Sequence, residues 1–263
     1  MKRFDYHLHS EYSMDSGESL SNISAKAIRE EMEEIAVTDH AELQNPEDLP
    51  DFHCRQAELA ELNQKYEGSL KLKSGIELGQ PHRFPKEAEQ ILSETAFDFV
   101  IASLHELETL GSPANFAFDK TSAPVFFRQY FEELRVIAET ADYDVLGHVT
   151  LPFRYVPESL SDLHHPMLYR REYEEIFRIV IGRGKGIEVN TSGLRTRLGE
   201  PMPGAELLSC YHNLGGRVIT VGSDGHSCRS AFLGIETGME TLNRAGFETV
   251  TVFTNRIQKQ VKL

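Results

Sequence analysis

The sequence predicts an α/β fold in which parallel strands form a barrel. Seven short runs rich in apolar and β-branched residues recur along the chain, and amphipathic helical segments separate most of them. Parallel strands need long crossover connections, usually helices, so this repetition indicates βα units. The connections that enter the expected strands are short and those that leave them are long. Most loop mass therefore lies at the carboxyl end of the sheet, where α/β folds build their active sites.

The strands are expected in segments that are apolar and short. In chain order they are residues 3–9, 34–40, 70–78, 97–105, 143–149, 185–192 and 217–226. Helices are expected at residues 21–32, 54–66, 124–141, 169–182 and 205–215. The first of these helices opens with good N-cap residues, and the last ends in the glycines typical of a helix C-terminus.

An open, doubly wound sheet is the alternative to a barrel. A glycine-rich phosphate-binding loop directly after the first strand would favour the open sheet. Here the first strand continues into HLHSEYSMDSGES instead, and the glycine-containing stretch GRGKG precedes a strand rather than following one. We therefore expect a barrel.

Composition limits the class of protein. The 263 residues are enough for a single domain spanning 1–263, and 40% hydrophobic residues provide a sizeable core. A formal net charge of −14 disfavours nucleic acid and anionic membranes as partners. We find no apolar stretch of membrane-spanning length, no apolar segment near the N-terminus and three scattered cysteines, so we expect a cytoplasmic protein. The sequence leaves the oligomeric state open.

Ionisable residues gather at the carboxyl ends of the expected strands. In the first strand His7 and His9 stand at positions i and i+2, so both imidazoles point to one face. One histidine at a strand end is more often a core residue than a ligand, but six of the eleven histidines lie at these ends together with three carboxylates. The sequence therefore predicts a metal centre at one rim. Its candidate ligands are His7, His9, Asp15, His40, Glu77, His105, His148, Asp224 and His226.

Nine ligands are too many for one ion. Zinc takes four ligands in most protein sites, and imidazole with carboxylate suits zinc, iron or manganese. We therefore expect two or three divalent transition metal ions that share a bridging carboxylate. Three divalent ions against three carboxylates leave a net positive charge, which would attract a phosphate dianion despite the acidic surface.

The motifs HLH, TDH, GIE, SLH, GH and SDGH, in this order and at strand ends, resemble those of the PHP (polymerase and histidinol phosphatase) superfamily. They are most similar to its stand-alone histidinol-phosphate phosphatases, from His7 to about residue 240. The resemblance implies a distorted (β/α)7 barrel, a TIM-like fold, with a trinuclear site. It also implies a phosphoric monoester hydrolase that converts L-histidinol phosphate to L-histidinol in histidine biosynthesis.

The resemblance also implies which ligands share an ion. His7, His9, Glu77 and Asp224 would hold the first metal, Glu77 would bridge to a second held by His105 and His148, and Asp15, His40 and His226 would hold the third. Because every expected ligand position is filled, we expect a competent enzyme. A hydroxide held by the metals would attack phosphorus in line, and the metals, Asp224 or His226 would assist the departing alkoxide.

Substrate-binding candidates lie in the loops that follow the strands. Arg154 stands six residues beyond His148, and Arg195 and Arg197 follow the sixth strand. The planar guanidinium suits phosphate, and similarly placed arginines bind phosphate in the resembling family. We expect Arg154 and one of Arg195 and Arg197, with Arg195 preferred, to bind the phosphate. Glu42 is a candidate partner for a substrate amine. The alternative is that Glu42 is an exposed loop carboxylate with no role in binding.

Further hypotheses concern the surroundings of the ligands and rival functions. Asp5 and Asp39 are candidates to orient ligand imidazoles through their free N–H groups. An amidohydrolase-type barrel also begins with H-x-H but commonly needs a lysine at a mid-barrel strand end, where this chain has SLH. Two more rival functions are a non-catalytic scaffold and a phosphatase for a different small ester, such as a sugar phosphate or nucleotide.

Overall fold

A parallel sheet curved into a nearly closed barrel organises the protein. The computed structural model describes residues 3–160 and 164–263. The strand order is β1-β2-β4-β5-β6-β7-β8, and the short β3 extends the position of β2 along β4. The strands are β1 (Phe4–Leu8), β2 (Glu34–Val37), β3 (His40–Glu42), β4 (Lys71–Gly79), β5 (Phe99–Ser103), β6 (Val145–Leu146), β7 (Gly186–Asn190) and β8 (Ile219–Gly222). The seven expected strand segments are confirmed.

The barrel closes where the end of β1 meets the segment that follows β8. The contact is a single parallel bridge between Leu8 and Gly225, not a full ladder. The amide of Asp224 donates to the carbonyl of His7 at 2.8 Å, and the amide of His9 donates to the carbonyl of Gly225 at 3.0 Å. This partial closure is the distortion that the sequence led us to expect, and it brings the two ends that carry candidate ligands side by side.

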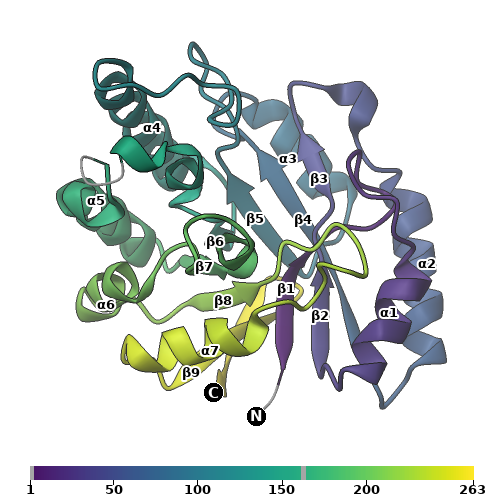
Figure 1. Cartoon of the computed structure of the whole chain (residues 1–263). Coiled ribbons are helices and arrows are strands. Elements are labelled where there is room, and N and C mark those ends of the chain that lie inside the picture. Colours follow the sequence, from purple (N-terminus) through teal and green to yellow (C-terminus); the bar gives the residue numbers. More distant parts are fainter. Residues whose placement is uncertain (1–2, 161–163) are drawn as a thin grey trace.

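Helices follow the strands and ring the sheet (Figure 1). They are α1 (Leu20–Arg29), α2 (Phe52–Lys65), α3 (Pro85–Glu94), α4 (Ser122–Thr140), α5 (Arg170–Gly182), α6 (Ala205–Asn213) and α7 (Ile235–Arg244). The seven βα units make a distorted (β/α)7 barrel. The sequence analysis did not single out α3 and α7. In α3 only Ala88 is buried, and Ile91 and Leu92 are partly buried against the core. None of the described helices is both long and apolar enough to cross a membrane.

The loops at the carboxyl ends of the strands contain short 3₁₀ turns. These are η1 (Pro46–Asp48), η2 (Leu151–Tyr155), η3 (Glu158–Leu160), η4 (Pro166–Tyr169) and η5 (Thr191–Arg195). Two of them carry candidate phosphate ligands, since Arg154 lies in η2 and Arg195 ends η5. The predicted concentration of loop mass at this end is therefore confirmed, and part of it has regular structure.

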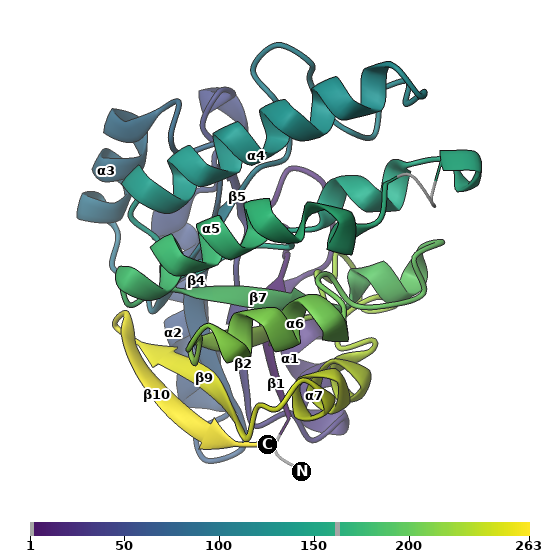
Figure 2. The same cartoon turned by 90° about the vertical axis from the view of Figure 1, so that its left-hand side faces the viewer.

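A C-terminal hairpin that the sequence analysis did not foresee packs near the amino ends of the strands. It consists of β9 (Thr249–Thr254) and β10 (Ile257–Lys262), and Figure 2 shows it beside the chain termini. The amide of Phe253 donates to the hydroxyl of Tyr6 at 2.7 Å, and the ring of Phe253 lies 5.0 Å from that of Phe99. The hairpin thus anchors one end of the barrel, away from the ligand-bearing rim.

We predict that Phe253→Ala destabilises the protein by about 3–5 kcal/mol, because it removes a buried aromatic ring and leaves a cavity. Ile257→Ala in the same hairpin is the control, since Ile257 is 73% exposed whereas Phe253 is 3% exposed. Urea unfolding of both variants measures the difference in unfolding free energy. Equal stability of the two variants would show that the hairpin does not contribute to the core.

Candidate metal centre

The carboxylate of Glu77 lies at the centre of the predicted ligands. It projects from β4, is fully buried and faces imidazoles from four other segments. Its Oε2 lies 3.0 Å from His7 Nε2 and 3.0 Å from His40 Nδ1. Its Oε1 lies 3.1 Å from His105 Nε2 and 3.0 Å from His148 Nε2. One carboxylate therefore faces both sides of the cluster, as a bridging ligand must.

Asp224 brings the end of β8 to the histidines of β1. Its Oδ1 lies 3.3 Å from His9 Nε2 and 3.8 Å from His7 Nε2. Its other oxygen accepts hydrogen bonds from Ser192 Oγ at 3.2 Å and Asn190 Nδ2 at 3.3 Å. The backbone of Asp224 is left-handed, with φ of 53°. Such conformations are uncommon outside glycine and cluster at functional sites.

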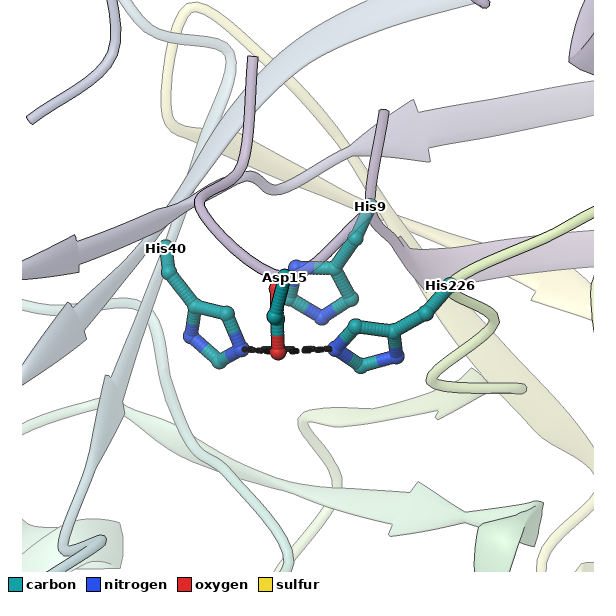
Figure 3. Close-up of side chains that lie close together, drawn as sticks. All are labelled: His9, Asp15, His40 and His226. Carbon is teal, nitrogen blue, oxygen red and sulfur yellow. Dashed lines mark hydrogen bonds and ion pairs between the residues drawn. The ribbon is translucent and has the colours of Figure 1, made fainter. Parts of the chain in front are cut away.

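Asp15 and the neighbouring histidine side chains form a further group on the open side of the cluster (Figure 3). Oδ2 of Asp15 lies 3.0 Å from His226 Nε2 and 3.5 Å from His40 Nε2. The ring of His9 stacks against those of His40 and His226, at centroid distances of 4.2 and 4.0 Å. His9 therefore lies within reach of two groups of ligands, not only the one that the sequence resemblance indicated.

The donor set fits divalent transition metals. The ligand atoms form compact groups: His7 with His9 and Asp224; Glu77 with His105 and His148; and His9 with Asp15, His40 and His226. Nitrogen and carboxylate oxygen ligands of this kind suit zinc, iron and manganese. Within the described residues, the buried atoms His9 Nε2 and His40 Nδ1 face carboxylate oxygens of Asp224 and Glu77 at 3.3 and 3.0 Å, yet neither atom has hydrogen-bond geometry. Buried polar atoms are normally hydrogen-bonded, so nitrogens that face carboxylates without hydrogen bonds fit a site built for a cation.

The electrostatics of the cluster also favour cations. Burial raises the pKa of Glu77, but the imidazoles of His7, His40 and His105 outweigh burial and hold that pKa well below its ordinary value. Burial lowers the pKa of His40, yet Glu77 and Asp15 raise it to about 10. Burial, together with the neighbouring His40, lowers the pKa of His9 to about 3. The site thus keeps ionised carboxylates in a buried setting, where positive charge stabilises them.

Two glutamates contact the ring nitrogens of ligands on the side away from Glu77. Glu188 Oε1 accepts from His7 Nδ1 at 2.6 Å, and Glu42 Oε1 accepts from His105 Nδ1 at 2.5 Å. The sequence analysis missed Glu188. A carboxylate in the middle of the apolar strand GIEVN was the available signal.

The hypothesis that Asp5 and Asp39 orient imidazoles is wrong. Asp39 accepts from the backbone amide of Ser10 at 2.6 Å and pairs with the buried Arg55 at 3.1 Å. Asp5 accepts from the backbone amides of His7 at 3.1 Å and Ser223 at 2.9 Å. Each carboxylate holds backbone near the ligands, because it accepts from backbone amides and, in Asp39, from the side chains of Ser10 and Arg55, but from no ligand ring nitrogen.

A cleft opens above the cluster. It has a volume of about 300 Å³, and besides candidate ligands it is lined by Met14, Ser112, Pro113, Leu151, Arg154 and Tyr155. An adjoining hollow contains Arg154, Arg195, Asp224 and His226 together with Ser192 and Thr196. Both hollows are therefore contiguous with the candidate metal ligands.

The three candidate arginines differ in their surroundings. Arg154 donates to the Tyr155 hydroxyl at 2.6 Å, and Arg195 donates to the carbonyls of Ser223 and Asp224 at 2.9 and 3.1 Å. Arg197 donates to the carbonyl of Phe153 at 3.3 Å. In the described part of the chain, Arg197 lines neither hollow.

Comparison with known proteins agrees with this geometry. The PHP domain matches residues 5–192. The histidinol-phosphatase of Lactococcus lactis subsp. lactis (strain IL1403) is 30% identical over 279 residues, which cover 100% of this chain and 98% of that protein. A crystal structure of histidinol phosphate phosphatase from the same organism, complexed with zinc, L-histidinol and phosphate, aligns with a TM-score of 0.86 at 28% identity, over 98% of this chain and 99% of that one.

A solved structure from Listeria monocytogenes shares the fold. It aligns with a TM-score of 0.72 at 21% identity, over 89% of this chain and 99% of that one. The family match spans more than half of the chain and includes the strands that carry most of the candidate ligands. The chain belongs to the PHP domain family.

Proposed function

We propose that residues 1–263 act as one metal-dependent phosphomonoesterase domain that hydrolyses L-histidinol phosphate to L-histidinol and phosphate, a step of histidine biosynthesis. The observation that carries the proposal is a hollow in which Arg154 and Arg195 stand beside Asp224 and His226. Phosphate-binding cations thus adjoin the candidate metal ligands. The Lactococcus structure with zinc, L-histidinol and phosphate supports the choice of substrate. The cytoplasm stays the predicted location.

The nine residues predicted from the sequence would hold the metals. We propose the sets given by the resemblance, with Glu77 shared between two ions and His9 close enough to serve either of two groups. Zinc is the first candidate because the Lactococcus structure contains it, with iron and manganese as further candidates. When bound, such ions supply a nucleophile from water near neutral pH and neutralise charge on phosphoryl oxygens.

The side chains around the cleft would bind and orient the substrate. Arg154 and Arg195 would donate hydrogen bonds to the phosphoryl oxygens, each through the fork of N–H groups in the guanidinium plane, which matches a pair of phosphoryl oxygens. We favour Arg195 over Arg197 because Arg195 lines the hollow, whereas Arg197 reaches the carbonyl of Phe153. Asp224 or His226, which also face this space, would hold the proton that passes to the departing alcohol.

The proposed role of Glu42 as partner of a substrate amine competes with its present contacts. Its Oε1 accepts from His105, and its Oε2 accepts from Gln80 at 2.9 Å and Gln44 at 3.1 Å. Glu42 lines the cleft, so the carboxylate can still meet a cation there. In either role, the negative charge of Glu42 favours a cationic substrate group on this side of the cleft.

We predict that the protein releases phosphate from L-histidinol phosphate faster than from glycerol 3-phosphate, glucose 6-phosphate or AMP. Phosphate release is measured for all four esters with one sample whose metal content is determined. Equal rates for the four esters would favour a general phosphatase, and no release by the metal-loaded protein would contradict phosphomonoesterase activity.

Stringent chelation is expected to reduce phosphate release to background, and added Zn²⁺ or Mn²⁺ is expected to restore it. His105→Ala should lower both bound metal and turnover, because it removes one of the imidazoles that face Glu77. The exposed His53→Ala, at the start of α2, is the control and should retain both. Full activity after complete metal removal would eliminate the proposed mechanism.

We predict that Arg154→Ala and Arg195→Ala each raise KM for the phosphate ester about 10-fold or more, since a charge-assisted hydrogen bond contributes about 1.5–3 kcal/mol. Arg197→Ala is the matched control from the same loop and should change KM less than about 2-fold, because Arg197 lines neither hollow and donates to the carbonyl of Phe153 instead. If Arg197→Ala raised KM while Arg195→Ala did not, the two assignments would have to be exchanged.

A further inference from the structure

We propose that Glu188 is a positioning residue of the metal centre: its carboxylate fixes the ring of His7 and joins the ligand-bearing ends of three strands. The proposal rests on the metal-dependent function proposed above. Glu188 lies in the middle of β7, and none of the nine predicted ligands comes from that strand. With Glu188 included, each of the seven βα units contributes a side chain to the centre.

The contact between Glu188 and His7 determines which ring nitrogen faces the cluster. Glu188 is 1% exposed, and its Oε1 accepts from His7 Nδ1 at 2.6 Å. A carboxylate acceptor requires a proton on Nδ1, so Nε2 is the nitrogen that presents its lone pair to a metal. Nε2 is also the atom that lies 3.0 Å from Glu77 Oε2. The pair therefore selects the tautomer that a metal ligand needs.

The second oxygen of Glu188 contacts the backbone of a second candidate ligand directly and a third ligand through an asparagine. Oε2 accepts from the backbone amide of His148 at 2.9 Å and from Asn190 Nδ2 at 3.2 Å. The same amide nitrogen of Asn190 lies 3.3 Å from Oδ2 of Asp224. One buried carboxylate thus connects the side chain of His7, the backbone of His148 and, through Asn190, the carboxylate of Asp224.

The adjacent strand leaves room for this pair. A Cβ atom placed on Gly222, the last residue of β8, would overlap both Cβ of His7 and Oε1 of Glu188. The glycine therefore permits the close approach of β8 to the His7–Glu188 contact. This observation is independent of the hydrogen bonds and indicates that three strands are shaped around the hydrogen-bonded pair of His7 and Glu188.

The chain offers a matched control in Glu34. Glu34 is also a buried strand carboxylate, 5% exposed, and it accepts a hydrogen bond from Tyr6, the residue directly before His7 in β1. Tyr6 contacts the hairpin through the backbone of Phe253, at the end of the barrel away from the ligands. The Glu34→Gln substitution thus removes the charge of a buried carboxylate that, like Glu188, accepts a hydrogen bond from a side chain of β1. Unlike Glu188, Glu34 does not contact a candidate ligand.

The experiment compares Zn²⁺ affinity of wild type, Glu188→Gln and Glu34→Gln, with each protein stripped of metal and titrated in competition with a chelator of known affinity. We expect Glu188→Gln to bind the tightest ion about 10–100-fold more weakly, the usual effect of losing a partner that orients a ligand. We expect Glu34→Gln to keep wild-type affinity, even where its thermal stability falls. Folding is checked by circular dichroism on the same samples.

The Zn²⁺ titrations separate failure of the Glu188 proposal from failure of the proposed function. Equal Zn²⁺ affinity in Glu188→Gln and wild type would overturn the proposal, and so would an equal loss in Glu188→Gln and Glu34→Gln. Absence of Zn²⁺ binding by wild type would instead contradict the proposed function. If Glu188→Gln does not fold, the pair Glu188→Asp and Glu34→Asp replaces it: the shortened side chain at 188 cannot reach both His7 and His148, so its affinity should fall while that of Glu34→Asp does not.

Discussion

A single buried carboxylate organises this protein. Glu77 cannot be placed in a barrel interior as an isolated charge, because desolvation of an unpaired carboxylate is too costly. It is compensated by four imidazoles that reach it from the ends of other strands. Those imidazoles can converge only if the parallel strands are in register and the sheet curves back on itself. The fold and the site therefore depend on the same electrostatic requirement.

The parallel register explains how distant parts of the sequence meet. His40 of β3 stands opposite Glu77 of β4, and the closure of the barrel brings Asp224 against His7. A buried ion pair between Arg55 and Asp39 then holds the loops that follow β1 and β2, since Asp39 also accepts from Ser10. Helix α2 supplies Arg55, so an outer helix supports the loops that carry His9 and His40.

The side of the site that is proposed to bind phosphate has a different origin. Arg154 and Arg195 lie in 3₁₀ turns of the loops, where the backbone is not restrained by the sheet. Arg154 is half-buried and Arg195 is exposed, whereas Glu77, His7 and His9 are fully buried. Loops on a rigid scaffold are the usual place for such contacts, because they vary without disturbing the core. The buried part of the candidate metal centre thus lies on rigid strand ends, whereas the proposed phosphate ligands lie on loops.

The sequence alone predicted the seven strand segments, the barrel and the group of nine ligands. Apolar runs and strand-end histidines are local patterns, and parallel strands place their carboxyl ends together whatever the details of packing. The sequence analysis did not single out α3, which buries little, or the C-terminal hairpin, although the alternation in TVTVFT was an available signal for the hairpin. The packing of the hairpin depends on Tyr6 and Phe99, which lie far away in the chain.

The tertiary structure decided which acids touch which histidines. Asp5 and Asp39 bind backbone amides, whereas Glu188 and Glu42 contact the rings of His7 and His105. It also separated Arg195, which lines the hollow, from Arg197, which turns to Phe153. Spacing along the chain predicts which residues can reach the carboxyl ends of the strands. Which atom meets which depends on distances of a few ångströms between strands, and those distances exist only once the barrel has closed.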